Sequence, residues 1–286
     1  QLFYGYMQYH LLNSRQASWN IIKLATKDYA NNPVSAFARA NIALNTQLND
    51  AALKALAGYK DGEPPIPHLD YLLGNALLHK LDPECRHYFA GYIDRFKGHS
   101  YIKDAYLKIG WGYLLKGKDS FYNKCMYLVK HKGKAVRAED KQAIKETGHY
   151  NEDNLYLLKA RLLYDGGYYE KALKKLKSRE EPEKQAVTQL HYLEHHYRLG
   201  RILQALNRDD AALKAYRALK SFSPSEMEQY YLPAAYLQSG MIYEANNAYR
   251  KAREHFKQVK EFSGYPYEKS FSQKAKAGLK RLEAHE

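Results

Sequence analysis

Glu194-His195-His196-Tyr197-Arg198-Leu199-Gly200 aligns without gaps with Ala234-Ala235-Tyr236-Leu237-Gln238-Ser239-Gly240, and Leu155-Tyr156-Leu157-Leu158-Lys159-Ala160 aligns with both. Each stretch ends on a small residue, and these small residues are 40 positions apart. An alanine follows each of them twelve positions later, and a large apolar residue comes four positions after that alanine. The three sets are Ala160, Ala172 and Leu176; Gly200, Ala212 and Tyr216; and Gly240, Ala252 and Phe256.

This spacing predicts pairs of helices joined by tight turns. Two helices approach closely only where both present small side chains, so the small residue of the first helix is expected to meet the alanine of the second. The large residue one turn later then fills the groove beside this crossing. Turn-forming residues stand between the predicted helices at Asp165-Gly166-Gly167, Asn207-Arg208-Asp209 and Asn246-Asn247. The sequence therefore predicts an all-α fold.

The unit from Tyr192 to Pro224 resembles the tetratricopeptide repeat, in which a small residue, an alanine, a large residue and a terminal proline occur in this order. The resemblance implies an α-solenoid, a right-handed superhelix of helix-turn-helix repeats. The spacing of 40 exceeds the usual period of about 34 residues. The stretches 154–169 and 272–279 are also similar to tetratricopeptide proteins of Bacteroidetes-type bacteria, which implies a protein that is commonly exported and of unassigned function.

The pattern divides the chain into five segments. These are diverged N-terminal helical repeats at 1–57, a proline-rich connector at 58–68, diverged repeats with a basic insertion at 69–153, three tetratricopeptide-like repeats at 154–266, and a C-terminal capping helix at 267–286. In the diverged part, Gly74 and Gly110 occupy the small-residue position. Near the start, residues 18–31 followed by Asn32-Pro33 resemble the second helix of a pair with its terminal proline.

The resemblance also implies a binding groove. In tetratricopeptide units the concave face is formed by positions three before, one after and four after the small residue of the first helix. The groove residues predicted in this way are Tyr71, Asn75, Trp111, Arg161, Tyr164, Tyr197, Arg201, Gln204, Met241 and Glu244. An aromatic and aliphatic face with two arginines suits an extended peptide or an amphipathic helix. The alternative is that Leu107, Leu157 and Leu237, at equivalent positions, belong to the core and only the polar members face solvent.

These residues predict a non-catalytic scaffold with a protein or peptide partner. The alternative comes from charge, since 45 Lys and Arg against 31 Asp and Glu give a net charge of +14, which favours acidic partners. The basic insertion, residues 116–145, interleaves lysines with Phe121, Tyr122 and Tyr127, a combination that can contact a nucleic-acid backbone and stack bases. A solvated helix face is the more common meaning of such a run. Nucleic-acid or anionic-surface binding is therefore the second hypothesis.

A third hypothesis is a zinc-dependent hydrolase. His191-Tyr192-Leu193-Glu194-His195 matches the H-x-x-E-H pattern, in which two histidines share a zinc ion and the glutamate acts on bound water. A third ligand is needed, and a chain with 12 histidines contains such pairs by chance. Solvated histidines are favoured, so no metal and no cofactor are predicted. Cys85 and Cys125 each precede a histidine, yet no strand-to-helix elbow is expected for a nucleophile. No enzyme is predicted.

Compartment is constrained only in part. No stretch approaches the ~18–20 apolar residues of a membrane span, so a soluble chain without a transmembrane segment is expected. Two cysteines exclude a disulfide-rich framework but leave one disulfide open. The sequence starts at Gln1. An exported or periplasmic location is expected if a leader has been removed, and a cytoplasmic one otherwise.

Overall fold

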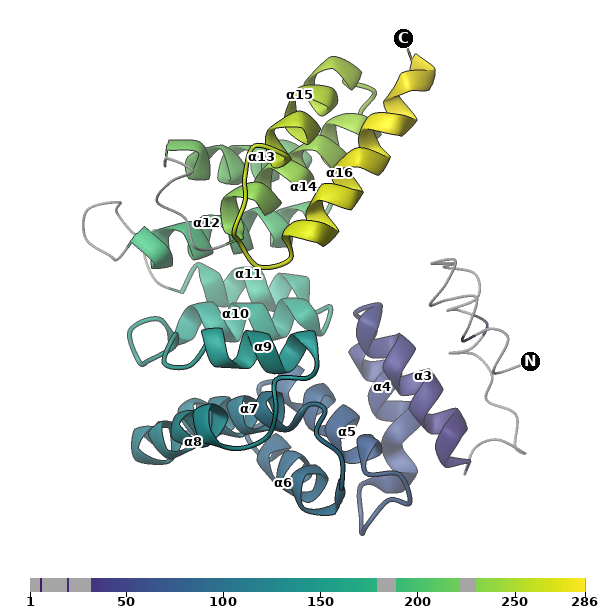
Figure 1. The fold of residues 1–286 in the computed structure, drawn as a ribbon, viewed down its shortest axis with the longest axis vertical. Helices are drawn as coiled ribbons and strands as arrows, with labels where there is room; N and C mark the ends of the chain where they lie inside the picture. Colours follow the sequence, from purple (N-terminus) through teal and green to yellow (C-terminus); the bar gives the residue numbers. More distant parts are fainter. Residues whose placement is uncertain (1–5, 7–19, 21–31, 179–188, 222–229, 286) are drawn as a thin grey trace. The chain divides into compact units, whose positions relative to one another are not determined.

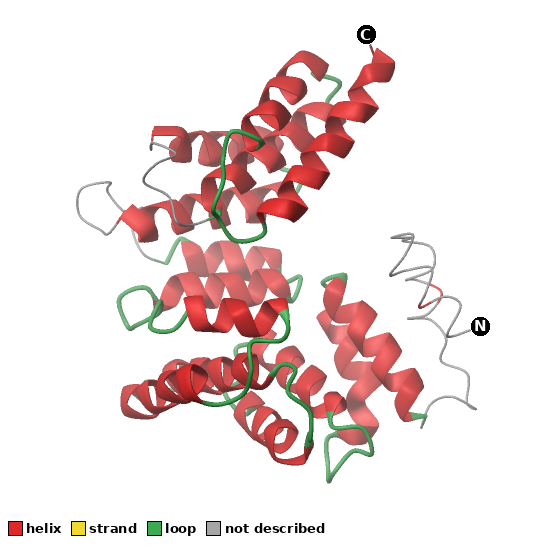
Figure 2. Cartoon of the chain, in the orientation of Figure 1, coloured by secondary structure: helices red, strands yellow, loops and turns green. Residues whose placement is uncertain are grey.

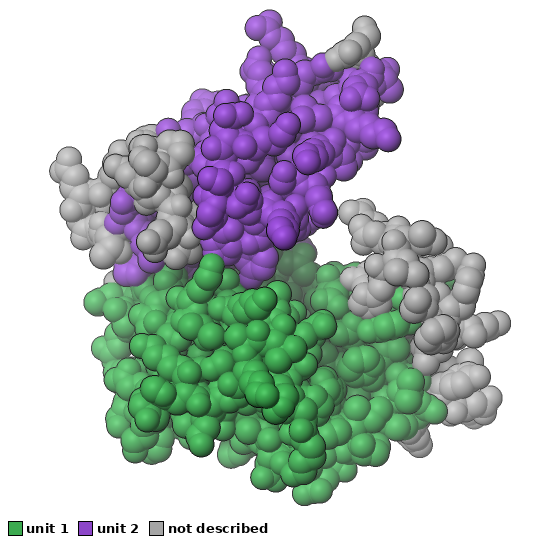
Figure 3. Space-filling view, in the orientation of Figure 1, with its two compact units in different colours: residues 1–168 green, residues 169–286 purple. Residues whose placement is uncertain are grey.

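The computed structural model describes residues 6, 20, 32–178, 189–221 and 230–285 (Figure 1). Fourteen α-helices lie in these residues and pack as sequential helix pairs, and no strand occurs in them (Figure 2). The prediction of an all-α fold is confirmed. The chain divides into two compact units, residues 1–168 and 169–286, which Figure 3 shows in different colours. Within the described ranges, no helix is both long enough and apolar enough to cross a membrane.

Unit 1 contains eight of the described helices. They are α3 (Pro33–Asn45), α4 (Asn49–Leu56), α5 (His68–His79), α6 (Cys85–Arg95), α7 (Ile102–Leu115), α8 (Asp119–His131), α9 (Ala138–Lys145) and α10 (Leu155–Asp165). A short 3-10 helix, Ala57–Tyr59, follows α4, and residues 60–67 of the predicted connector form no helix. The predicted helix at 18–31 lies outside the described residues except for Asn20.

Unit 2 contains the other six. They are α11 (Tyr169–Leu176), α12 (Gln189–Ala205), α13 (Asp209–Ala218), α14 (Tyr231–Ala245), α15 (Tyr249–Val259) and α16 (Glu268–Leu282). Among the described residues of unit 2, Leu219–Ser221 and Glu283–His285 form short 3-10 helices. Pro224, which was predicted to end a helix pair, lies outside the described residues.

The turns after α3, α5, α7, α10, α12 and α14 share one local structure. In each turn a left-handed residue lies seven positions after a small residue of the preceding helix. The left-handed residues are Gln47 (φ 60°), Leu81 (62°), Gly117 (65°), Gly167 (81°), Asn207 (56°) and Asn247 (57°). The next residue donates its N–H to the carbonyl five positions earlier, at 2.8 Å from Leu48 to Ala43 and at 2.8 Å from Ala248 to Tyr243. This is the Schellman ending of a helix, and it marks six copies of one turn between residues 40 and 248.

The first of these turns identifies a helix pair that the sequence analysis did not assign. Asn32 is the N-cap of α3, with its Oδ1 accepting from the N–H of Val34 (2.9 Å) and Ser35 (3.0 Å), and Pro33 is the first helical residue. The dipeptide therefore begins a helix. Ala40 precedes Ala52 by twelve positions and Leu56 by sixteen, and all three are buried. The pair α3–α4 thus repeats the pattern of unit 2.

In two helix pairs of unit 2, the large residue of the second helix packs against the glycine of the first. A Cβ added to Gly200 would lie 2.3 Å from Cε1 of Tyr216, and one added to Gly240 would lie 2.7 Å from Cδ1 of Phe256. The ring sixteen positions later therefore lies directly against each glycine, as expected for the large residue that fills the groove beside the crossing. The ring can approach this closely because glycine has no side chain to occupy the space.

The extra helix α9 lies within the predicted basic insertion and stabilises α7. Its Asp140 is completely buried, and the carboxylate accepts from the N–H groups of Tyr101 (2.9 Å) and Lys103 (3.1 Å) at the start of α7. The first N–H groups of a helix have no partner within that helix. In return, Nζ of Lys103 donates to the carbonyls of Val129 (2.7 Å) and Lys130 (3.1 Å) near the end of α8. Two helix ends are closed by side chains that are distant in sequence.

Candidate functional site

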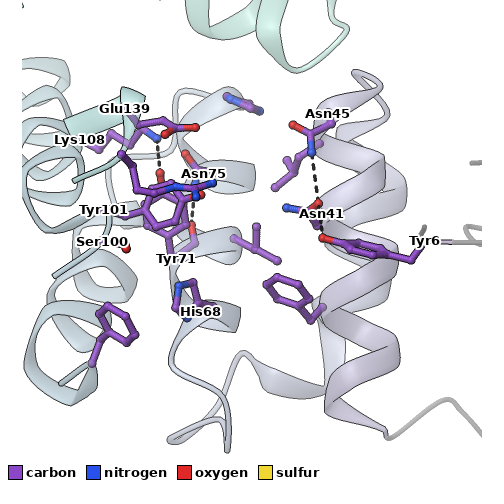
Figure 4. Close-up of a pocket in the computed structure, with 16 residues that line it drawn as sticks. Tyr6, Asn41, Asn45, His68, Tyr71, Asn75, Ser100, Tyr101, Lys108 and Glu139 are labelled. Atoms are coloured by element: carbon purple, nitrogen blue, oxygen red, sulfur yellow. Dashed lines mark hydrogen bonds between the residues drawn. The ribbon is translucent and has the colours of Figure 1, made fainter. Parts of the chain in front are cut away.

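Unit 1 contains a concave site, a cavity of about 670 Å³ (Figure 4). Its walls come from α3, α5, the start of α7 and the segment that enters α9. The lining residues are Tyr6, Phe37, Asn41, Leu44, Asn45, His68, Tyr71, Leu72, Asn75, His79, Phe96, Ser100, Tyr101, Lys108, Arg137 and Glu139. Its volume is in the range of small-molecule and peptide side-chain pockets, about 300–1,000 Å³.

Asparagine amides stand on opposite walls of this cavity (Figure 4). On α3, Oδ1 of Asn41 accepts from Nδ2 of Asn45 (3.2 Å) and from the hydroxyl of Tyr6 (3.3 Å). On α5, Nδ2 of Asn75 donates to the carbonyl of Tyr71 (2.8 Å). Within the described residues, Nδ2 of Asn41 and Oδ1 of Asn75 form no hydrogen bond. The two walls therefore offer one donor and one acceptor.

The charged part of the cavity is built around Tyr71. Its hydroxyl donates to Oδ2 of Asp104 (2.6 Å) and accepts from Nζ of Lys108 (3.1 Å), and Lys108 also pairs with Asp104 (2.6 Å). Burial, together with the carboxylate of Asp104, raises the pKa of Tyr71 well above its usual value. Tyr71 therefore stays a neutral donor at physiological pH, and its ring is held in place by the cation 4.9 Å from the centroid.

Aromatic rings form the wall of the cavity around His68, in the lower part of Figure 4. His68 contacts Phe96, with centroids 4.7 Å apart, and Phe37, with centroids 6.3 Å apart, both edge to face. Desolvation lowers the pKa of His68, so it is a neutral ring at physiological pH. Tyr101 lies 4.9 Å from Tyr71, and the guanidinium of Arg137 lies 5.5 Å from the Tyr101 centroid. The wall thus combines flat apolar surface with a cation.

His79 closes the cavity at the end of α5. Its Nδ1 lies 3.1 Å from Oδ1 of Asn49, and Nδ2 of Asn49 donates to the carbonyl of Ala76 (2.8 Å). Desolvation lowers the pKa of His79 to about 4. This histidine is neutral at physiological pH and is fixed by a buried amide.

Of the predicted groove residues in unit 1, Tyr71 and Asn75 line the cavity, and the other three do not. Trp111 is buried beneath the guanidinium of Arg161, which lies 5.1 Å from the indole centroid. Arg161 also pairs with Glu146 at 2.7 Å. Tyr164 is partly buried, and its carbonyl accepts from Nε2 of Gln47 (2.9 Å).

In unit 2, the predicted groove residues contact other parts of the same unit. Nη1 of Arg201 donates to the hydroxyl of Tyr197 (3.1 Å), and Oε1 of Gln204 accepts from the hydroxyl of Tyr216 (2.9 Å). Met241 packs against the cluster of α14, α15 and α16.

The last predicted residue, Glu244, accepts two bonds from Arg281 of α16, from Nε (2.6 Å) and from Nη2 (2.7 Å). Leu237, for which the sequence left core and groove open, is 1% exposed and is a core residue, as are Leu107 and Leu157.

The α3 wall of the cavity contains none of the groove residues predicted from the sequence. Applied to Ala40, the rule of three before, one after and four after gives Phe37, Asn41 and Leu44, and all three line the cavity. The signal was present in the spacing of Ala40, Ala52 and Leu56. Asn32-Pro33 starts α3, whereas the sequence pattern predicts the end of a preceding helix there.

The glutamate and second histidine of the H-x-x-E-H stretch and the two cysteines, the other groups considered for chemistry, are buried or engaged in an ion pair. Glu194 of the H-x-x-E-H stretch is fully buried, and its Oε1 accepts from Nε of Arg198 (2.6 Å). Desolvation lowers the pKa of His195 to about 4. Among the described residues, no group of three His, Cys, Asp or Glu could hold a metal ion. Cys85 and Cys125 are buried free thiols, and burial raises their pKa values to about 12 and about 11.

No protein-family model matches the sequence, and no curated protein matches it. The function of the cavity must therefore be derived from its own residues.

Proposed function

We propose that the chain is a tetratricopeptide-like α-solenoid that acts as a non-catalytic scaffold, and that it binds an extended segment of a partner polypeptide in the cavity of unit 1. The observation that carries the proposal is the position of the lining residues. Phe37, Asn41 and Leu44 of α3 and Tyr71 and Asn75 of α5 occupy the positions that follow from the repeat spacing. Two successive repeats therefore present equivalent faces to one cavity.

The chemistry of the lining suits a peptide main chain. An asparagine amide carries both a donor and an acceptor, as a peptide group does. The free Nδ2 of Asn41 can donate to a main-chain carbonyl, and the free Oδ1 of Asn75 can accept from a main-chain N–H. Amide pairing of this kind gives affinity without sequence preference, and the pockets beside it select side chains.

Selectivity comes from the aromatic wall. Phe37 and His68 offer flat surface to an apolar side chain, and aromatic surface contributes strongly to peptide binding. Lys108 is paired with Asp104 (2.6 Å), and Arg137 shares the lining with Glu139, so the charges of the lining are balanced. We therefore expect preferred peptides to carry one apolar or aromatic side chain.

The test is selection from a displayed library of random extended peptides against the full chain, followed by calorimetry on the selected peptide. Asn41→Ala and Asn75→Ala are each expected to weaken binding about ten-fold, since each removes one buried hydrogen bond of about 1.5 kcal/mol. Asn123→Ala is the matched control, because Asn123 is an exposed asparagine on α8 outside the cavity. Selected peptides that bind both cavity variants as tightly as the native chain would overturn the proposal.

A further inference from the structure

The outer surface of α8 carries a basic and aromatic stripe that the cavity does not use. The buried face of α8, formed by Tyr122, Cys125, Met126 and Val129, packs inside unit 1. A Cβ on Gly110 of α7 would lie 2.6 Å from Cε of Met126, so the contact is close. The opposite face is therefore the one that solvent reaches.

Exposed aromatic rings lie along this outer face. Tyr127 is 62% exposed and Phe121 is 48% exposed, which is unusual for side chains of this size. The ring of Tyr127 lies 4.2 Å from that of His131, and the ring of Phe121 stacks on that of Tyr113 with centroids 5.0 Å apart. Each exposed ring is thus supported on one side by a neighbour. Rings supported in this way are pre-organised for stacking.

Lysines alternate with these rings. Residues 120–138 contain no Asp or Glu, and the basic residues in this range are Lys124, Lys130, Lys132, Lys134 and Arg137. Nζ of Lys124 lies 5.3 Å from the Phe121 centroid. Within the described part of the chain, the four lysines form no ion pair, whereas Lys116 just before them pairs with Glu84 (2.8 Å). Their charge is not neutralised by neighbours.

The stripe has the periodicity of a single helix face. Ser120, Lys124, Tyr127 and His131 recur at intervals of four, three and four, so they lie in one row along α8. Phe121 borders this row on one side and Lys130 on the other. The helix ends at His131, and the segment 132–134 that follows it contains two more lysines.

We infer that this stripe, defined by Phe121, Lys124, Tyr127, Lys130, His131, Lys132 and Lys134, binds single-stranded nucleic acid. Lysines attract a phosphate backbone, and exposed rings stack bases without sequence preference. A lipid surface fits less well, because an interfacial helix buries a broad apolar face, and the apolar face of α8 is already packed inside the protein. This inference is independent of the peptide site proposed for the cavity.

The experiment is fluorescence anisotropy of labelled 20-residue oligo(dT) and oligo(U) with the full chain at about 50 mM salt. We expect dissociation constants in the micromolar range and a slope of log affinity against log salt of about −3, for four phosphate contacts on a single strand. Tyr127→Ala should weaken binding about ten-fold with little change in the salt slope, because stacking is lost and charge is kept. Tyr127→Phe should bind like the native chain.

Charge reversal separates this stripe from the general positive charge of the protein. Lys124→Glu with Lys130→Glu should weaken binding at least ten-fold. Lys257→Glu with Lys276→Glu makes the same change in net charge at exposed positions of unit 2 and should have a much smaller effect. Equal loss in both double variants, or no binding at about 50 mM salt, would overturn the inference. Binding to phosphatidylserine vesicles but not to either oligonucleotide would also overturn it and would assign the stripe to membranes.

Discussion

Units 1 and 2 share the apolar contacts set by the repeat spacing but differ in the polar contacts between their helices. In unit 2, Tyr216 and Phe256 are fully buried, and each ring lies against a glycine of the partner helix. Phe256 also contacts a second glycine, since a Cβ on Gly278 would lie 2.6 Å from its Cε2. Apolar contacts of this kind depend only on spacing, so they recur at a fixed interval in the sequence.

Unit 1 adds buried polar contacts to this scheme. Asp140 closes the start of α7, and Asp70 pairs with Arg95, whose Nη1 also donates to the carbonyl of Pro64 (2.7 Å). Burial raises the pKa of Asp70, while the hydrogen bond and charge of Arg95 oppose that shift. Removing one partner of such a contact leaves the other buried and unsatisfied. The comparison shows that unit 1 adds specific polar partners between helices to the apolar contacts that both units share, since Phe89 of unit 1 also lies against Gly74.

The largest expected effect is in unit 2. Phe256→Ala removes a ring that fills the space between α14, α15 and α16, and the free energy of unfolding should fall by about 4 kcal/mol. Hydrogen exchange of α14 and α15 amides measures this change. Lys257→Ala, the next residue and exposed, should change it by less than about 0.5 kcal/mol. Similar losses in the two variants would show that ring packing does not hold this unit together.

A second variant tests the polar contacts of unit 1. Asp140→Ala leaves several N–H groups at the start of α7 without a partner, so the free energy of unfolding should fall by about 3 kcal/mol. Hydrogen exchange of α7 amides should show the change. Asp140→Asn keeps an acceptor and should cost less. Glu139→Ala, at the exposed neighbouring position, is the control, and a loss as large as that of Asp140→Ala would argue against the capping role.

A third variant tests whether the Tyr216 ring needs the space left by the missing side chain of Gly200. Gly200→Ala places a methyl group against the Tyr216 ring, a strain of about 2–3 kcal/mol, and the better helix propensity of alanine returns about 1 kcal/mol. The net loss should be about 1–2 kcal/mol by denaturant unfolding. Gly58→Ala has no atom within 4 Å of the added carbon and should be neutral or slightly stabilising. A neutral Gly200→Ala would show that the ring can move away.

The smallest expected effect is a pH dependence in unit 1. His79 has a pKa of about 4 in the folded protein, below its value of about 6.5 in an unfolded chain. Between pH 6.5 and 4 the unfolded chain binds a proton that the folded protein does not, so stability falls as pH falls through this window. Because the His79 ring is partly exposed, we expect this loss in the free energy of unfolding to be only about 1 kcal/mol. The difference in stability between the native chain and His79→Gln should therefore shift by this amount between pH 7 and pH 4.5.

The sequence was informative where spacing alone determines structure. Gly200, Tyr216, Gly240 and Phe256 follow one rule, and the structure pairs each glycine with its ring. The spacing predicted a large side chain beside each glycine, but the sequence does not show how closely the ring approaches it. The buried role of Asp140 could not be predicted either, since its partners are 36 to 39 positions away.

The cavity likewise contains residues that the repeat spacing predicts and residues that it does not. Tyr71 and Asn75 were found from the repeat rule, and Phe37 and Asn41 obey the same rule once Ala40 is identified. Lys108 lies one helical turn after Asp104 on α7 and pairs with it, whereas its contact with Tyr71 of α5 joins two helices and is specified by no helical period. Trp111 was placed in the groove by the rule, and the structure places it beneath Arg161. The repeat spacing therefore predicts which residues could line the cavity, and contacts between helices determine which of them do.

The cap of α7 by Asp140 has a consequence for synthesis of the chain. A ribosome releases α7 well before it releases residue 140, because the carboxylate lies 37 positions after Lys103. Until then the first turn of α7 has only water for its N–H groups, and the helix frays there. During translation, the cavity wall around Tyr101 therefore matures only after α9 has emerged and docked.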